Sequence, residues 1–197
     1  MLEEEYEKDR RRPPRHLRRV RPTEQPFSYS LRPVRESDTP DIREIYNHYV
    51  TNSSVTFDEQ ESTLAHWHEK RQRLHAAGLP FLVAESPTGQ VLGYAYVQPW
   101  SSKTAYRFTV EDSIYLGQAA AGHGLGTALL AALVTACEES GIRTIIAVIS
   151  DKGAEASIAV HRRLGFVETG RMGRVGFKFG RWLGVVNMQK TLTRRRR

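Results

Sequence analysis

The segment SIYLGQAAAGHGLGT, residues 113–127, decides the fold of this chain. It begins as an apolar strand, passes through a glycine-rich loop and opens a run of helix-forming residues. Gly122, Gly124 and Gly126 let the backbone approach a ligand closely. The free amides of the loop and of the first helical turn, together with the helix dipole, form a site for an anion such as a pyrophosphate. The segment therefore predicts a strand–loop–helix unit that binds phosphate groups.

A dinucleotide site of the Rossmann type is the main competing interpretation of this segment. Asp151 follows the next expected strand, roughly where a ribose-binding acid would stand. The glycines, however, lack the G-x-G-x-x-G spacing, and three consecutive strands precede the motif instead of a βαβ unit. We therefore disfavour a Rossmann fold, and a glycine-rich turn without a ligand remains the plain alternative.

Hydrophobic periodicity and turn residues predict the elements on both sides of this unit. In chain order, we expect a strand at 29–34, helices from Asp38 and from Ser62 to Gly78, strands at 80–85, 91–98 and 109–117, a helix at 124–140, a strand at 142–149, a helix at 156–164, and strands at 166–174 and 182–192 around a glycine-rich loop. Runs of consecutive strands exclude a simple doubly wound parallel sheet. The predicted fold is α/β (α+β), with a mixed central sheet flanked by helices on both faces.

The composition indicates one domain with charged ends. The chain has 197 residues, of which 40% are hydrophobic, enough for a single core. Residues 1–27 combine charge runs and prolines with few apolar side chains, so we predict a disordered basic extension. The domain is expected over 28–192, followed by a basic tail at 193–197.

Charge and hydropathy exclude several function classes. The net charge is +7, but residues 1–29 hold eight Lys/Arg against six Asp/Glu, the tail adds four arginines, and the remainder is nearly balanced. A nucleic-acid-binding domain carries its basic patch on the folded surface, so we expect no nucleic-acid partner. No stretch approaches the roughly 20 apolar residues that span a bilayer, so we expect no membrane partner. The single Cys137, expected as a buried small hydrophobe, fits a cytoplasmic location.

Four stretches carry a resemblance to a known family: AYRFTVEDSIY at 105–115, GLG at 124–126, HRRLGF at 161–166 and GFKFGRW at 176–182. With NHYV at 47–50 and QPW at 98–100, they resemble the phosphinothricin acetyltransferase and L-amino acid N-acyltransferase branch of the GNAT superfamily of N-acetyltransferases. The likeness covers about residues 31–192. It implies a splayed sheet that admits the arm of acetyl-CoA between its two central parallel strands, and a homodimer.

The resemblance also assigns the cofactor contacts. It implies that the pantetheine arm binds along the strand, and that the loop amides hold the pyrophosphate; the residues are Ile114, Tyr115 and Leu116 in the strand, and His123, Gly124, Leu125, Gly126 and Thr127 in the loop. Ala121 stands where the family usually has Gln or Arg, and Ala154 where Asn is common. Loss of one polar contact costs on the order of 1 kcal/mol, so we expect weaker or differently anchored CoA binding.

Acetylation of an amine needs a base, because the amine is mostly protonated near neutral pH. A carboxylate whose pKa is raised by partial burial suits this task. The resemblance matches Glu111 to the general base, while strand alternation turns Asp112 to the other face and makes it structural. His161 matches a functional histidine of the family, expected to orient Glu111 or to relay protons toward the leaving group. The plain alternatives are a solvated Glu111 and a core histidine.

The resemblance implies that the acceptor is a small amino acid such as phosphinothricin, methionine sulfone or methionine sulfoximine. Arg107, four residues before Glu111, can hold a carboxylate in a bidentate pair. The resemblance places Phe57 in a loop over the substrate, and Trp100 and Tyr106 form apolar walls. The segment 173–180 is expected to fold toward the active site or a partner subunit.

Three alternatives stay open or are set aside. The acceptor can instead be an aminoglycoside, a polyamine or a protein N-terminus, and a CoA-binding sensor without turnover is the alternative from another class. A metal site is not expected, because His66 and His68 are two residues apart on a helix and point in different directions.

Overall fold

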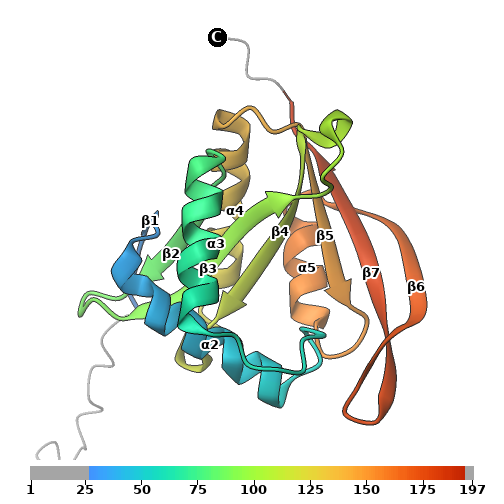
Figure 1. The fold of residues 1–197 in the computed structure, drawn as a ribbon, viewed down its shortest axis with the longest axis horizontal. Helices are drawn as coiled ribbons and strands as arrows, with labels where there is room; N and C mark the ends of the chain where they lie inside the picture. The colour runs from blue at the N-terminus through green and yellow to red at the C-terminus, as the bar shows by residue number, and fades with distance from the viewer. Residues whose placement is uncertain (1–26, 194–197) are drawn as a thin grey trace, which may run out of the picture.

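The computed structural model describes residues 27–193. The predicted disorder of residues 1–27, apart from its last residue, and most of the predicted basic tail lie outside the described residues. The described part forms one layered α/β unit, with a twisted sheet between two pairs of helices (Figure 1).

Seven strands of the described chain form one sheet in the order β1-β2-β3-β4-β5-β7-β6. Their bounds are Ser30–Pro33 (β1), Phe81–Glu85 (β2), Val91–Pro99 (β3), Thr109–Leu116 (β4), Thr144–Ser150 (β5), Val167–Lys178 (β6) and Arg181–Thr191 (β7). Strands β4 and β5 run parallel, and the other neighbouring strands are antiparallel. The expected mixed sheet is therefore confirmed.

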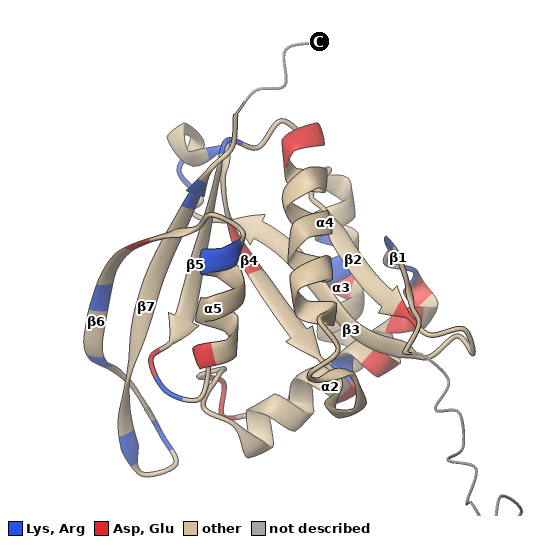
Figure 2. Cartoon of the chain, turned by 180° about the vertical axis from the view of Figure 1, so that it is seen from behind, with Lys and Arg blue, Asp and Glu red and all other residues tan. Residues whose placement is uncertain are grey.

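The helices cover the two faces of the sheet in pairs. The pair α2 (Thr39–Asn52) and α3 (Leu64–Ala76) lies in front of the sheet in Figure 1, and the pair α4 (Leu125–Glu139) and α5 (Glu155–Arg163) lies behind it, as the reverse view of Figure 2 shows. The α4 side buries an aliphatic core that includes Leu129, Leu133 and the free Cys137. The α3 side buries an aromatic core around Trp67 and Tyr94. The two faces of the sheet therefore differ in chemistry.

Strands β4 and β5 separate after a short paired stretch. They pair only from Thr109–Thr144 to Glu111–Ile146, whereas β5 stays paired with β7 along its whole length. Residues beyond Glu111 in β4 therefore have no strand beside them on the β5 side. The predicted splay between the two parallel strands is present, and Figure 1 shows the two arrows diverging.

The predicted glycine-rich loop between the strands at 166–174 and 182–192 was wrong. The residues between them are mostly strand, because β6 continues to Lys178 and pairs with β7 up to the Lys178–Arg181 contact. The connection is Phe179-Gly180, with φ values of 52° and 71°, the left-handed conformation that two-residue hairpin turns require. Phenylalanine is not a residue type that predicts a turn. The glycines expected to form the loop lie within the strand pair instead, where the register shifts between Met172 and Gly176.

Candidate active site

The separation of β4 and β5 opens a cavity of about 460 Å³. Its walls come from Glu111–Leu116 of β4, from the last four residues of β5, from α5 and from the loop that contains Phe57. The cavity lies between strands that elsewhere in the sheet are bonded to each other, so backbone polar groups line it as well as side chains. Such a slot suits an extended ligand that can replace the missing strand contacts.

The main chain of β4 alternates between β3 and this slot. The amide of Gly117 donates to the carbonyl of Leu92 in β3, which fixes the phase of the antiparallel ladder. Tyr115 consequently turns its main chain toward β3, while Ile114 and Leu116 turn theirs toward the β5 side. The carbonyl of Leu116 accepts a hydrogen bond from Tyr49 Oη at 2.8 Å, and Tyr49 also lines the cavity. The main chain of Ile114 and the amide of Leu116 are left for a ligand in the slot.

The glycine-rich loop ends at the start of α4, beside this slot. Gly122 and Gly124 have φ values of 82° and 75°, and nothing lies within 4 Å of a Cβ placed on either. Helix α4 begins after Gly124 without a side-chain cap. The amide of Thr127 is bonded to the Gly124 carbonyl at 3.1 Å, so Leu125 and Gly126 are the first-turn residues that offer free amides at the positive end of the helix dipole. The loop therefore presents open backbone to an anion, as the segment predicts.

The two alanines that depart from the family pattern border the same region. Ala121 is exposed just before the loop glycines. Ala154 is buried at the start of α5, which has no side-chain cap, and it lines the cavity. Neither side chain offers a polar contact, so ligand binding here depends on the backbone.

Glu111 lies on the α2–α3 face of β4 at the edge of the cavity. Its side chain is half-buried and its cross-strand neighbour is Gln98 of β3. Burial raises the pKa of Glu111, and the negative charge of Asp112 adds to that rise, while the Gln98 side chain and the positive charge of Lys70 oppose it. A carboxylate with these properties is a candidate general base.

Asp112 and His161 form a buried pair on the opposite face. Nε2 of His161 lies 2.9 Å from Oδ2 of Asp112, and its Nδ1 donates to the carbonyl of Ser157 at 2.7 Å. Burial lowers the pKa of His161, but the hydrogen bond and the charge of Asp112 outweigh burial and raise it overall. Oδ1 of Asp112 has no partner among the described residues, and Asp112 lines the cavity.

This pairing corrects one expectation about His161. It does not orient Glu111, because alternation along β4 puts Glu111 and α5 on opposite faces of the sheet. Asp112, expected as a structural residue, is the side chain that His161 contacts. The sequence places both residues on the correct elements, but the pair joins positions 49 residues apart, which local periodicity cannot reveal.

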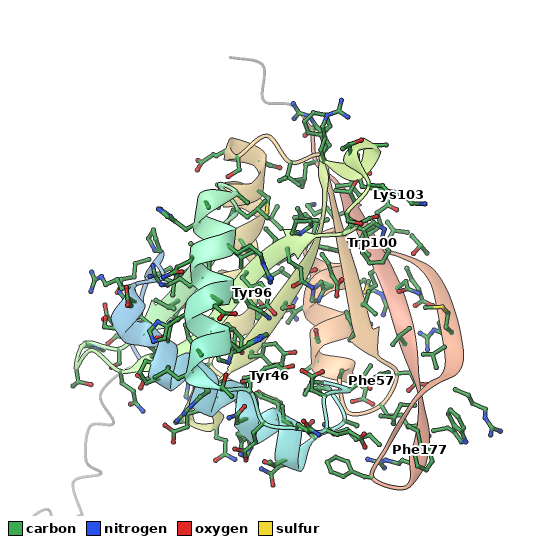
Figure 3. The ribbon with its side chains drawn as sticks, in the orientation of Figure 1. Tyr46, Phe57, Tyr96, Trp100, Lys103 and Phe177 are labelled. Carbon is green, nitrogen blue, oxygen red and sulfur yellow. The ribbon has the colours of Figure 1, made fainter. Side chains whose placement is uncertain are left out.

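The four residues expected to bind the acceptor are spread around the opening. Phe57 lines the cavity, and β6 holds it in place, since a Cβ on Gly176 would lie 2.5 Å from its ring. Trp100 and Tyr106 are exposed and lie outside the cavity lining; Figure 3 shows Phe57 below the opening and Trp100 above it. Arg107 is exposed and lies 4.5 Å from the Phe108 ring, outside the lining as well.

Among residues 27–193, no group of three or more His, Cys, Asp or Glu side chains could hold a metal ion. The helices of this part of the chain include none that is both long enough and apolar enough to cross a bilayer.

The chain is similar to known acetyltransferases. The family described as acetyltransferase (GNAT) domain matches residues 31–186. An L-methionine sulfoximine/L-methionine sulfone acetyltransferase of Pseudomonas aeruginosa is 41% identical over 169 residues, covering 84% of this chain and 96% of the relative.

Two solved structures are similar in both fold and sequence. A GNAT superfamily phosphinothricin acetyltransferase from Sinorhizobium meliloti in complex with AcCoA gives a TM-score of 0.80 at 43% identity, covering 84% of this chain and 89% of that one. A ribosomal-protein-alanine N-acetyltransferase from Brucella melitensis gives 0.79 at 39% identity, covering 83% and 99%.

Proposed function

The chain belongs to the GNAT acetyltransferase family, and we propose that it transfers the acetyl group of acetyl-CoA to the α-amine of a small amino acid of the phosphinothricin, methionine sulfone or methionine sulfoximine kind. The observation that carries the proposal is the slot between β4 and β5, which has Glu111 at its edge. Relatives with these acceptors match nearly the whole described domain.

The residues around the slot fit an extended thioester cofactor. We assign Ile114, Tyr115 and Leu116 to the pantetheine arm, with Ile114 supplying main-chain bonds and the ring of Tyr115 closing the α2 side. The pyrophosphate is assigned to the segment from His123 to Thr127, with the free amides of Leu125 and Gly126 as main-chain donors; the residues are His123, Gly124, Leu125, Gly126 and Thr127. Acetyl-CoA supplies an acyl group already activated as a thioester. The backbone cradle remains complete despite Ala121 and Ala154.

Glu111 is assigned to accept the proton of the attacking amine, directly or through one water. Its raised pKa increases its basicity, and its half-buried position leaves it open to the cavity. Bringing the amine and the acyl carbon together in one slot supplies most of the remaining rate acceleration. No covalent enzyme intermediate is involved, since Cys137 is buried in the α4 core, where burial raises its pKa to about 12.

His161 is assigned to the leaving thiolate, through Asp112. Both ring nitrogens of His161 are engaged, one with Ser157 and one with Asp112, so the histidine has no free position for a ligand. Oδ1 of Asp112 is the unpartnered atom of the pair and belongs to the cavity wall. In this proposal, protonated His161 gives its Nε2 proton to Oδ2 of Asp112, and rotation of the carboxyl group turns that O–H toward the cavity. The thiolate takes the proton and leaves as the free thiol, and His161 regains a proton from solvent after release.

We also propose a homodimer built around the β6–β7 hairpin. This hairpin exposes a group of large apolar side chains, whose exposed fractions are about one half: Met172, Val175, Phe177, Phe179 and Trp182. A patch of this kind on a soluble domain is typical of an interface. Light scattering that gives twice the mass of the chain supports the dimer, and a monomer at micromolar concentration contradicts it. The cytoplasmic location stays a prediction, based on the single cysteine.

Thiol release from acetyl-CoA tests the proposed reaction. The acceptor panel contains phosphinothricin, methionine sulfone, methionine sulfoximine, an aminoglycoside, a polyamine and a peptide beginning with alanine. We expect release with at least one of the first three and none with the others. Release with the peptide alone would move the acceptor class toward protein N-termini, the acceptor type named in the Brucella relative. CoA binding without release for any amine would indicate a sensor.

A further inference from the structure

Lys70 of α3 presents a fixed ammonium group on the same face of the sheet as Glu111. Its Nζ lies 4.8 Å from the ring centroids of both Trp67 and Tyr96 and donates to Tyr96 Oη at 3.1 Å. The two rings are buried and inclined at 81° to each other, so they form two walls of a cage around the cation. Figure 3 labels Tyr96 next to α3, the helix that carries Lys70. The ammonium is therefore held by protein contacts instead of moving freely in solvent.

The ammonium group of Lys70 is available to bind an anion, because it has no acidic partner among the described residues. Among residues 27–193, no Asp or Glu side chain forms an ion pair with Lys70, whereas the next residue, Arg71, is paired with Glu36 at 2.9 Å. An ammonium has three donor hydrogens, and the hydrogen bond to Tyr96 uses one of them. A half-buried cation without a counter-ion favours binding of a negatively charged ligand group.

The position of this cation relative to Glu111 suits an α-amino acid. Across β3 and β4, Tyr96 pairs with Ser113 and Gln98 pairs with Glu111, so Lys70 and the carboxylate occupy neighbouring places on one face. They are close enough for the charge of Lys70 to act on the pKa of Glu111. In an α-amino acid, one carbon separates the amine from the carboxylate. An acceptor whose amine approaches Glu111 therefore carries its carboxylate into the vicinity of Lys70.

We propose that Lys70 binds the carboxylate of the acceptor and thereby makes the enzyme select free amino acids over amines that lack a carboxylate. The inference rests on the proposed transfer reaction and adds a specificity residue to it. Neither Lys70 nor Arg107, the cation expected from the sequence to do this, belongs to the lining of the slot. They differ because Arg107 is exposed and lies on the Phe108 ring, whereas Lys70 is half-buried, held by two rings and on the same face of the sheet as Glu111.

The test compares methionine sulfone with its carboxamide as acceptors for the wild type and for Lys70→Met. Arg73→Met is the matched control, because it removes one exposed positive charge from the same helix. We expect Lys70→Met to lower kcat/KM for the acid by roughly ten- to one-hundredfold, mainly through KM, the size of one hydrogen bond to a charged group. Activity toward the carboxamide is expected to stay within about twofold, and Arg73→Met to match the wild type.

Lys70→Gln, which keeps a polar contact to Tyr96, serves as a second variant if Lys70→Met does not fold, and Lys70→Arg is expected to retain the preference for the acid. Equal losses for acid and carboxamide, or no preference for the acid in the wild type, would overturn the role of Lys70. Calorimetry in the presence of CoA separates this result from failure of the proposed function. Binding of the acid that depends on Lys70, without thiol release, would leave the carboxylate site intact and reject the transfer reaction.

Discussion

Glu111 and Asp112 are adjacent in the sequence, yet β4 turns them to opposite faces of the sheet, where two carboxylates meet different surroundings. Glu111 is half-buried at the edge of the cavity, on the aromatic α2–α3 face, and no His or Arg side chain among residues 27–193 forms an ion pair with it. The side chain of Asp112 is almost fully buried against α5 and bonded to His161 at 2.9 Å. One strand therefore places two carboxylates in different surroundings, which suits the separate tasks proposed for them.

The difference shows how a sheet can divide a proton-transfer reaction. An amine that loses a proton and a thiolate that gains one need groups of opposite protonation preference near one carbonyl. Burial and the charge of Asp112 raise the pKa of Glu111, which strengthens it as a base, while the contact with Asp112 raises the pKa of His161, which favours the protonated imidazole. Strand alternation keeps the two sites apart although they are consecutive residues.

The largest expected effect comes from Glu111→Gln, which removes the base but keeps the side-chain shape. We expect kcat/KM at neutral pH to fall by about 10²- to 10⁴-fold, the usual contribution of a general base. CoA affinity and the melting temperature should stay near those of the wild type, because the residue is not part of a buried pair. Glu139→Gln, at an exposed carboxylate on α4, is the control. Unchanged turnover in Glu111→Gln would remove Glu111 as the base and break the comparison.

The same variant predicts a change in the pH profile. Because the pKa of Glu111 is raised above its ordinary value of 4.5, kcat/KM in the wild type should increase with pH as Glu111 loses its proton. Deprotonation of the amine adds a second increase at higher pH in both proteins. In Glu111→Gln only the second increase should remain, measured with saturating acetyl-CoA between pH 5 and pH 9. An identical profile in both proteins would show that Glu111 does not titrate in the reaction.

Asp112→Asn is expected to affect stability more than Glu111→Gln does. Removing one charged partner of a buried pair costs about 3 kcal/mol of unfolding free energy, measured by urea denaturation, and Glu44→Gln on the exposed side of α2 is the control.

The pH dependence gives this prediction its sign. The folded pKa of His161 lies above its unfolded value of 6.5, so the pair stabilises the fold fully below that value. The stabilisation declines as pH rises through the folded pKa. This decline should be absent in Asp112→Asn, and its persistence would assign it to another group.

The sequence predicts the layers of this fold because each layer follows a local pattern. The strand, glycine loop and helix at 113–127 lie where periodicity puts them, and so do the paired helices on each face. The end of β6 was missed because Phe179 adopts a positive φ that its residue type does not signal. Positive φ at a non-glycine residue is maintained by tertiary contacts, here the Phe177–Trp182 and Lys178–Arg181 pairs and the bonds from Lys178 to the carbonyls of Ser53 and Thr56.

Some residues of the candidate site can likewise be predicted from local sequence, and others cannot. Glu111 and the loop glycines can be found from one segment of sequence, because their chemistry and spacing are local. Asp112 contacts His161 of α5, and Lys70 contacts Tyr96 of β3. A local sequence pattern cannot predict a contact between a helix and a distant strand. The aromatic residues Trp67 and Tyr96 read as ordinary core positions, which they are, and the cage for Lys70 emerges only when α3 packs on β3.

Ala121→Arg has the smallest expected effect. The residue lies outside both faces of β4, so the variant tests whether cofactor binding is independent of the Glu111 and Asp112 sites. An arginine just before the loop glycines would add one charge-assisted contact to the pyrophosphate, which tightens CoA binding by roughly fivefold, or about 1 kcal/mol. Because Ala121 is exposed, the longer side chain meets no core, and the melting temperature without CoA should stay the same. The pH profile of kcat should also stay the same, since neither Glu111 nor the Asp112–His161 pair is altered.

Calorimetric titration with CoA tests this prediction, with Ala121→Gln as an uncharged control. A gain in affinity with an unchanged profile would show that cofactor binding and proton transfer are separable on this scaffold, whereas a shifted profile would mean that the loop and the faces of β4 are coupled.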